Sequence, residues 1–457
     1  MLDLESQIRA LVPASAVLTG DEIADDYTHD EALTAEPVTP IAVVKPANTD
    51  DVAAIMRVCD ELRVPVTARG AGTGLSGACI PRADGIVVSM EQMNAIIEID
   101  TENHVAVVQP GVTLDQLDEA LAPLGLVYPV CPGENSASLG GNVATNAGGM
   151  RAVKYGVTRH QVLGLEAVLA NGDVIRTGGK FVKATTGYDL TQLIIGSEGT
   201  LALVTEATLK IYPRPEHTAT VLVPFASVNE VAAAVPTIVR SGVNPVVLEY
   251  VDGGGLATLC ANVGLELGVA PEVQEAAQAY LIIVLEQHLA TRLDEDLEAL
   301  GGLLHELGAM DVYVLPPANG ALLIEAREKA FWVVKGLGAN DIIDVVVPRA
   351  SVPEYLQRVA AIASENASYV SAAGHAGDGN IHLSVFQPDP DVRHTVMHAI
   401  IAAGIELGGA ISAEHGIGKE KMQYFLELED PNKIALMRRI KAAFDPNGIL
   451  NPQTLLD

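Results

Sequence analysis

The chain has 457 residues, 49% of them hydrophobic, and 58 acidic against 28 basic residues give it a formal net charge of −30. This length predicts two or three domains with large cores, and the charge opposes binding to nucleic acid or to an anionic membrane. The four cysteines form no C-x-x-C pair, and no stretch approaches the ~20 apolar residues that span a bilayer. We therefore expect a cytoplasmic protein without a membrane span or an iron–sulfur cluster of its own.

The first predicted helix covers residues 49–63, where the apolar residues fall at helical spacing and Thr49 is the expected N-cap. A short strand, VPVTA, then leads into RGAGTGLSG, in which Gly72, Gly74 and Gly77 fit the G-x-G-x-x-G spacing. A Rossmann unit needs a helix directly after these glycines. Here Pro81 and a turn precede another strand, so the sequence argues against an NAD site.

The next elements lead to a second glycine-rich stretch. A capping box at residues 113–116 predicts a helix, and PGENSASLGGNVATNAGGM follows at 132–150. Two apolar runs around Asn171-Gly172 predict a hairpin, and residues 193–213 are expected to be rich in strands, with a glycine turn at 196–199. Pro213 and Pro215 mark the expected domain boundary.

Beyond that boundary the pattern changes to repeated strand, helix and strand units. Two copies cover residues 218–251 and 279–316, and a looser one begins near 344 and includes a predicted capping box at Ser351 to Glu354. This alternation predicts an α+β domain whose sheet is covered by helices on one face. The last predicted helices lie near 394–407 and at 431–444.

Two sets of residues carry the chemistry. Backbone N–H groups of the two glycine loops can meet a pyrophosphate, although each loop alone could equally be a tight turn. GHAGDGNIH contains His375 and His382, and SAEHGIG contains Glu414 and His415. Two histidines and a carboxylate can bind a divalent metal, whereas packed or surface histidines are the alternative that the pattern alone leaves open.

Together with GSEGTLALVTEATLKI, the glycine loops resemble the flavin domain of the vanillyl-alcohol oxidase / p-cresol methylhydroxylase (PCMH) superfamily. GHAGDGNIH and AEHGIG are similar to the FAD-linked oxidase C-terminal domain of D-lactate dehydrogenases, D-2-hydroxyglutarate dehydrogenases and glycolate oxidase flavin subunits. The resemblance spans residues 37 to 452. It implies a helical lead-in at 1–36, a PCMH-type FAD-binding domain of two α/β subdomains at 37–215, and an α+β domain at 216–457 with an antiparallel, ferredoxin-like sheet and a tail that returns to the flavin.

The resemblance implies FAD as cofactor, held by both loops, with Glu198 and Gly199 near the adenosine end. The implied FAD ligands are Arg69, Gly70, Ala71, Gly72, Thr73, Gly74, Leu75, Pro132, Gly133, Glu134, Ser138, Gly140, Gly141, Asn142, Thr145, Asn146, Glu198, Gly199 and Asn451. Some relatives attach FAD through a histidine in the first loop. Because no histidine lies between His29 and His104, we expect non-covalent FAD.

The same resemblance implies His375, His382 and Glu414 as ligands of zinc or manganese, with iron as an alternative, and His415 as the catalytic base. The implied reaction is oxidation of a D-2-hydroxy acid to the 2-oxo acid by hydride transfer to the flavin. Arg327 matches the position that holds the substrate carboxylate; a surface arginine paired with Glu325 or Glu328 is the alternative.

Substrate preference rests on two further positions. Relatives specific for a second carboxylate have a threonine and a lysine where this chain aligns Phe331 and Ile342, which favours D-lactate or glycolate over D-2-hydroxyglutarate. Lys335 or Arg349 remain alternative sources of positive charge.

Two other functions stay open at this point. One is a flavoenzyme similar to alkylglycerone-phosphate synthase, which performs no net oxidation. The other is the flavin subunit of a glycolate-oxidase-type complex, inactive alone. Electrons are expected to leave to quinone, oxygen, an electron-transfer flavoprotein, a cytochrome or a separate iron–sulfur subunit. A homodimer is the default oligomer, and contact with a membrane is expected only through a partner.

Overall fold

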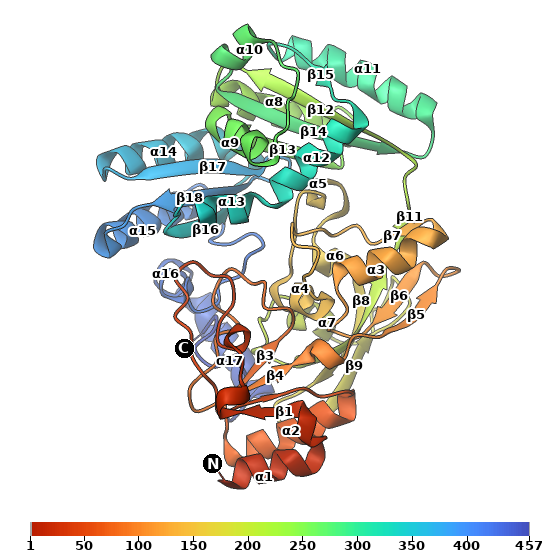
Figure 1. Cartoon of the computed structure of the whole chain (residues 1–457), viewed down its shortest axis with the longest axis vertical. Helices are drawn as coiled ribbons and strands as arrows, with labels where there is room; N and C mark the ends of the chain where they lie inside the picture. The colour runs from red at the N-terminus through yellow and green to blue at the C-terminus, as the bar shows by residue number, and fades with distance from the viewer. Residues whose placement is uncertain (1, 457) are drawn as a thin grey trace.

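A small, mostly parallel sheet forms the base of the N-terminal half of the computed structural model, which describes residues 2–456 (Figure 1). Its strand order is β1 (Val17–Thr19), β2 (Ala42–Val44), β4 (Ile86–Ser89) and β3 (Val66–Arg69). Helices α1 (Leu2–Leu11) and α2 (Thr49–Leu62) pack together and share one apolar core with the sheet. The N-terminal segment is thus not helical throughout, because it also supplies the edge strand β1.

The helix predicted at residues 49–63 is α2, but the N-cap predicted for it, Thr49, is wrong. The Asn48 side chain caps α2 by accepting from the Asp51 N–H at 2.9 Å. Thr49 is already inside the helix, and its hydroxyl donates to Glu166 at 2.5 Å. As expected, no helix follows the glycines after β3.

A second, antiparallel sheet completes the N-terminal half. Its order is β5 (Ile96–Asp100), β6 (Val105–Val108), β10 (Leu203–Lys210), β8 (Val162–Val168) and β9 (Val174–Gly178). The helices beside it are α3 (Leu114–Leu121), α4 (Leu139–Thr145), α5 (Ala152–Tyr155), α6 (Thr158–Gln161) and α7 (Leu190–Ile194), and β7 (Leu126–Val127) pairs with β11 (Tyr212–Pro213). The predicted capping box of α3 and the β8–β9 hairpin are confirmed. The stretch from 193 starts differently from the prediction, because its first residues end α7.

The C-terminal half is built on a seven-stranded antiparallel sheet. Its order is β15 (Tyr313–Val314), β12 (His217–Phe225), β14 (Ala279–Gln287), β13 (Val247–Asp252), β17 (Tyr369–His375), β18 (Asn380–Phe386) and β16 (Asp341–Val346). This confirms the predicted α+β class with an antiparallel second sheet.

Helices cover both faces of this sheet, so the prediction of one covered face is wrong. Along β12, Val221 and Val223 share a core with one helix layer, whereas Leu222 points to the other. The first layer holds α8 (Val228–Arg240), α11 (Ala290–Glu306), α14 (Val352–Glu365) and α15 (Pro390–Glu406). The second layer holds α9 (Gly253–Val263), α12 (Pro317–Glu328) and α13 (Ala330–Gly336). A short helix, α10 (Pro271–Ala276), precedes β14. The capping box predicted at Ser351 does not form, because Ser351 ends a 3-10 helix and its side chain makes no capping bond.

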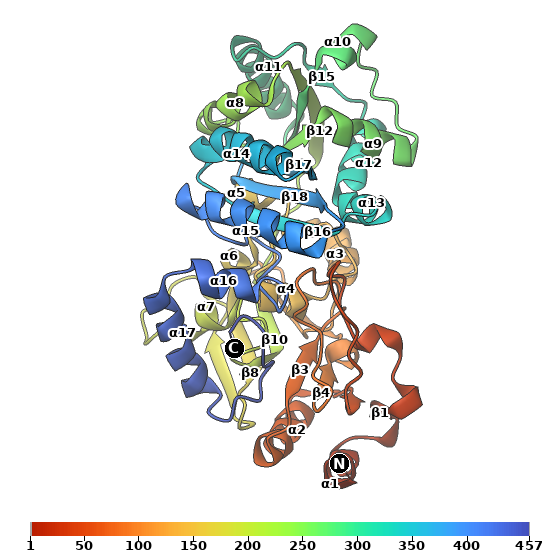
Figure 2. The same ribbon diagram turned by 90° about the vertical axis from the view of Figure 1, so that its left-hand side faces the viewer.

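The chain then returns to the N-terminal half. Helices α16 (Met422–Leu428) and α17 (Pro431–Phe444) lie beside it in both views (Figure 1, Figure 2). The tail continues along β3, since the Val66 N–H donates to the Ile449 carbonyl and the Asn451 N–H donates to the Val66 carbonyl, both at 2.8 Å. Of the helices described, none has the length and apolar character needed to cross a membrane.

Candidate active site

A cavity lies between the two glycine loops, and close backbone approach shapes it. A Cβ on Gly70 would lie 2.0 Å from the Ser138 hydroxyl oxygen, so a side chain there would displace that hydroxyl. That oxygen accepts from the N–H groups of Ala71 and Gly141, each at 3.2 Å. Ser138 therefore joins the first loop to the start of α4.

Most of the residues implied as FAD ligands line this cavity. They are Arg69, Gly70, Ala71, Gly72, Thr73, Gly74, Leu75, Pro132, Glu134, Ser138, Gly140, Gly141, Asn142, Thr145, Glu198, Gly199 and Asn451. Two lie elsewhere. Gly133 lines a neighbouring cavity, and Asn146 ends α4, where its side-chain oxygen accepts from the Arg159 N–H at 2.9 Å.

Glu198 and Asn451 connect distant segments around the cavity. The Glu198 carboxylate accepts from the N–H groups of Ile417 (2.9 Å) and Gly418 (2.7 Å). Burial raises the pKa of Glu198 to about 7, although these two N–H groups act in the opposite direction. The Asn451 amide donates to the carbonyls of Glu198 (2.8 Å) and Ala78 (3.0 Å). The Glu198 carboxylate thus fixes the loop that carries Glu414 and His415.

The three residues implied as metal ligands converge on one point. His375 ends β17, His382 lies in the neighbouring strand β18, and Glu414 lies in the loop after α15. Glu414 Oε1 is 3.0 Å from His375 Nε2 and 3.2 Å from His382 Nε2, and the two Nε2 atoms are 3.2 Å apart. Ligands that bind one zinc-sized ion at about 2.1 Å lie about 3.0–3.4 Å from one another. The donor set therefore fits a single divalent ion.

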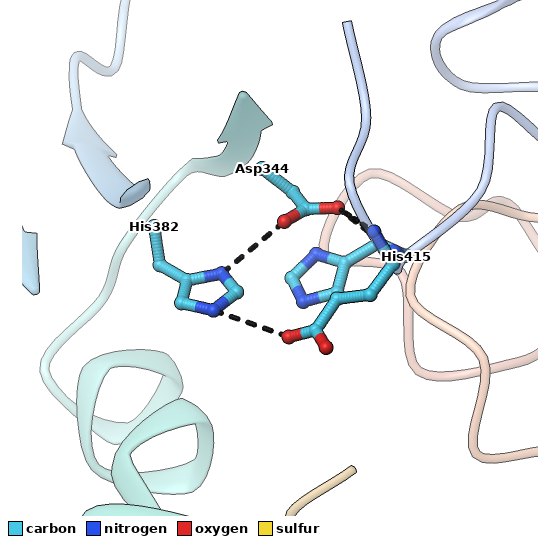
Figure 3. A group of neighbouring side chains, drawn as sticks. Asp344, His382 and His415 are labelled. Carbon is cyan, nitrogen blue, oxygen red and sulfur yellow. Dashed lines mark hydrogen bonds and ion pairs between the residues drawn. The ribbon is translucent and has the colours of Figure 1, made fainter. Parts of the chain in front are cut away.

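A second grouping, Asp344 with His382, Glu414 and His415, also places its donor atoms within 4.8 Å of one another. We favour the first set because hydrogen bonds already occupy Asp344. Its Oδ2 accepts from the Ser412 hydroxyl and from the N–H groups of residues 413, 414 and 415, while Oδ1 accepts from Asn380. Figure 3 shows Asp344 between the ring of His382 and the backbone of His415.

Two buried carboxylates lie behind the histidines, and one of them, Glu249, is within hydrogen-bond distance. Glu249 Oε1 lies 2.6 Å from His375 Nδ1, and Asp344 Oδ1 lies 3.5 Å from His382 Nδ1. Burial alone would lower the pKa of His375, but the carboxylates of Glu249 and Glu414 hold it well above its usual range. Carboxylates in this position present the opposite ring nitrogen to a metal.

His415 is placed differently from the other two histidines. Its ring stacks on His382 with centroids 5.0 Å apart, and its backbone N–H donates to Asp344 at 2.8 Å. Its Nδ1 is buried and has no hydrogen-bond partner within the part of the chain that the structure describes. Burial lowers the pKa of His415 to about 4, so its imidazole is neutral near pH 7.

Arg327 is buried in α12, so the alternative of a surface arginine is wrong. Its Nη2 lies 2.9 Å from Glu249 Oε2, while Glu325 pairs with Lys329 instead. The Arg327–Glu249 pair has the distance of an ion pair but not the angle of a hydrogen bond, since neither Nη2 nor Oε2 of the pair is hydrogen-bonded. Glu249 thus balances the charge of Arg327, whose Nε and Nη2 make no hydrogen bond within the described chain.

A second cavity adjoins the first, and Leu75, Pro132, Glu414 and His415 line both. Arg327, His375, His382, Phe331 and Ile342 line the second cavity alone. Lys335 and Arg349 do not line it, because Lys335 pairs with Glu31 at 2.6 Å and Arg349 donates to the Gly377 carbonyl. The two alternative sources of positive charge, Lys335 and Arg349, therefore do not supply charge to this cavity.

Comparison with known protein families assigns both halves. Residues 214–455 match the model described as "FAD linked oxidases, C-terminal domain", and residues 40–178 match an FAD binding domain. The chain belongs to the FAD-linked oxidase family.

This FAD-linked oxidase has close relatives among curated proteins. It is 54% identical to an uncharacterized FAD-linked oxidoreductase of Mycobacterium tuberculosis, over 99% of this chain and 98% of that protein. It is 40% identical to the glycolate oxidase subunit GlcD of Bacillus subtilis and 37% identical to a D-lactate dehydrogenase of Anaerostipes hadrus, each over 95% of this chain and 94% of the relative. It is therefore an FAD-linked oxidoreductase of the hydroxy-acid group.

Solved structures support the fold. Substrate-bound p-cresol methylhydroxylase superposes with a TM-score of 0.79 at 19% identity, covering 100% of this chain and 97% of the other. An alkyldihydroxyacetonephosphate synthase gives 0.77 at 17%, covering 99% and 85%. These matches confirm the PCMH-type architecture.

Sequence reasoning missed two residues of this FAD-linked oxidase, Glu249 and Asp344. Both are fully buried, and both contact a histidine of the donor set. Each is the single acid within an apolar run, VVLEYV in one case and IIDVVV in the other. A buried carboxylate requires a partner, so an isolated acid in such a run was the available signal.

Proposed function

We propose that this protein oxidises a D-2-hydroxy acid with one carboxylate, of the D-lactate or glycolate kind rather than D-2-hydroxyglutarate, to the 2-oxo acid. One observation carries the proposal. Glu414 and His415 lie in the wall shared by the cavity between the glycine loops and the cavity that contains Arg327. A substrate bound in the second cavity would therefore contact Glu414 and His415 where the second cavity adjoins the first.

Each residue has a distinct proposed role. The fork of Arg327 binds the substrate carboxylate, which places the hydroxyl-bearing carbon beside the cluster. His415, which lines both cavities, accepts the hydroxyl proton on its imidazole ring. Asp344 is a positioning residue, since it holds the backbone of His415 and faces His382.

His375, His382 and Glu414 would hold a zinc or manganese ion, with iron as an alternative. Bound metal supplies Lewis-acid activation of the substrate hydroxyl, and bound FAD supplies the hydride acceptor. The hydrogen bond between His375 Nδ1 and the buried Glu249 carboxylate supports the metal assignment.

The glycine loops would hold FAD without a covalent bond. Cys79 lines the same cavity, but burial raises the pKa of its thiol to about 12, which keeps it protonated and unreactive. We propose residues 37–215 as the flavin domain and 216–457 as the substrate domain. Electrons would leave FAD to a separate acceptor, such as quinone, an electron-transfer flavoprotein, a cytochrome or an iron–sulfur subunit.

Replacement of His382 tests the metal role most directly. His382→Ala should lose bound metal, as measured by elemental analysis, and should lose flavin reduction by D-lactate. His398→Ala is the matched control, because its ring is 40% exposed and lies 3.7 Å from Glu427, outside the cavity. Retained metal and retained turnover in His382→Ala would refute the assignment.

A further inference from the structure

We propose that the preferred substrate carries an extended apolar side chain on its hydroxyl-bearing carbon, and that this side chain lies along β17 and β18. The inference rests on the proposed function and narrows its substrate class. Its grounds are the length, the lining and the charge of the second cavity.

The floor of the cavity is a straight section of the antiparallel pair β17–β18. Facing residues form three successive rungs, Ala373 with His382, Ser371 with Ser384, and Tyr369 with Phe386, and all six line the cavity. Residues two apart on a strand point to the same face, so four residues from His382 to Phe386 span ~13 Å. The floor therefore begins at the histidine cluster and ends at two aromatic rings.

Apolar side chains form the opposite wall. Phe331, Val334 and Leu337 come from α13 and the residue after it, and Leu259 comes from α9, whereas Ile342 on β16 pairs with Ser384 and widens the floor. The far end is open, since Tyr369 is 63% and Leu337 is 61% exposed. A substrate chain can thus extend past Ser384 and leave through the opening.

The charge of the lining admits only one carboxylate. Apart from the histidines, Arg327 is the only cationic side chain among the described residues that line the cavity. The other charged residues there, Asp252, Glu328 and Glu414, are acidic. A second carboxylate on the substrate would lack a counter-ion and would meet these acids.

Small acids leave most of this surface uncovered. Glycolate and D-lactate place at most one carbon beyond the reacting carbon, so neither reaches the rung of Tyr369 and Phe386. Each added methylene that covers apolar wall should improve binding about fourfold. The geometry thus favours an aliphatic chain of several carbons.

The test is anaerobic single-turnover reduction of the bound flavin by glycolate and by D-2-hydroxy acids of three, four, six and eight carbons. We expect the reduction rate divided by the apparent Kd to rise about fourfold per methylene, reaching about 60-fold between D-lactate and D-2-hydroxyhexanoate. A ratio that is flat or falls beyond D-lactate would overturn the inference and leave the proposed function intact. No reduction by any of these acids would reject the proposed function as well.

A variant pair locates the effect. Ser384→Phe places a ring in the middle of the floor, and aromatic residues are well tolerated in strands. It should lower the preference for D-2-hydroxyhexanoate over D-lactate at least tenfold, whereas Ser384→Ala should keep it within twofold. Flavin content and Tm show whether each variant is folded. An unchanged preference in folded Ser384→Phe contradicts the placement, and the wild-type series decides the question if that variant does not fold.

Discussion

The variant Glu249→Gln tests the role of the carboxylate behind His375 while leaving the three proposed metal ligands unchanged. Glu249 is fully buried, with one carboxylate oxygen 2.6 Å from His375 Nδ1 and the other 2.9 Å from Arg327 Nη2. Glutamine keeps the size of the side chain and removes its charge. The variant therefore leaves Arg327 without its counter-ion and His375 with a weaker acceptor.

Two magnitudes follow from these contacts. Removing one partner of a buried ion pair costs about 3–5 kcal/mol, which should appear in the free energy of unfolding. A hydrogen bond to a charged group is worth about 1.5–3 kcal/mol, and that range corresponds to about 10- to 150-fold in metal affinity. Loss of a carboxylate behind a ligating histidine typically weakens metal binding by about 10–100-fold, in agreement.

The assay is titration of metal-free protein with Zn²⁺ against a competing chelator, together with urea unfolding. Glu166→Gln is the matched control. Glu166 is also a buried strand carboxylate, 6% exposed, and it pairs with Arg176 but lines neither cavity. The control should lose stability and keep its metal affinity. Zinc binding by Glu249→Gln within twofold of wild type would refute the reasoning.

Other substitutions test single roles. His415→Asn should slow flavin reduction about 10²–10⁴-fold at unchanged metal content, measured by stopped-flow absorbance; a normal rate would exclude this base. Arg327→Lys should raise the apparent Kd for D-lactate about 10–100-fold, because lysine lacks the fork; an unchanged Kd would place the carboxylate elsewhere. Ile342→Lys should raise the rate of flavin reduction by D-2-hydroxyglutarate relative to D-lactate, since it adds a cation to the lining, and an unchanged ratio would contradict that position. Burial raises the pKa of Glu198 from 4.5 to about 7, so the unfolding free energy of wild type should fall by about 3 kcal/mol as pH rises between these values; Glu198→Gln should lack this component in urea unfolding.

Local signals in the sequence predicted much of the fold. Local patterns placed α2 within one residue of its observed bounds and α17 at its observed bounds, and Asn171-Gly172 marked the β8–β9 hairpin. The errors arose where tertiary contacts decide. Ser351 fits a capping box by spacing, but the 3-10 helix before it already sets its backbone. The expectation of one covered face came from the order of strands and helices alone; the continuous apolar run of β12 is the pattern of a strand buried on both faces.

In the candidate site too, local motifs were informative and contacts between distant segments were not. Motif spacing singled out His375, His382, Glu414 and His415, which the structure brings together from β17, β18 and one loop. It could not show that Arg327 shares a carboxylate with His375, because the connection runs through Glu249 on a third strand. Glu249 is 78 positions from Arg327 and 126 positions from His375 in the sequence. Contacts over such separations leave no periodic pattern in the sequence.

The central claim is that a D-2-hydroxy acid reduces the flavin with the help of a metal. The most direct test follows the absorbance of the metal-loaded protein near ~450 nm under anaerobic conditions while D-lactate, L-lactate, glycolate and D-2-hydroxyglutarate are added separately. We predict rapid bleaching by a D-acid with one carboxylate, abolished by a chelator and restored by Zn²⁺ or Mn²⁺. Flavin that stays oxidised with every acid, or bleaching that is indifferent to the chelator, would contradict the account.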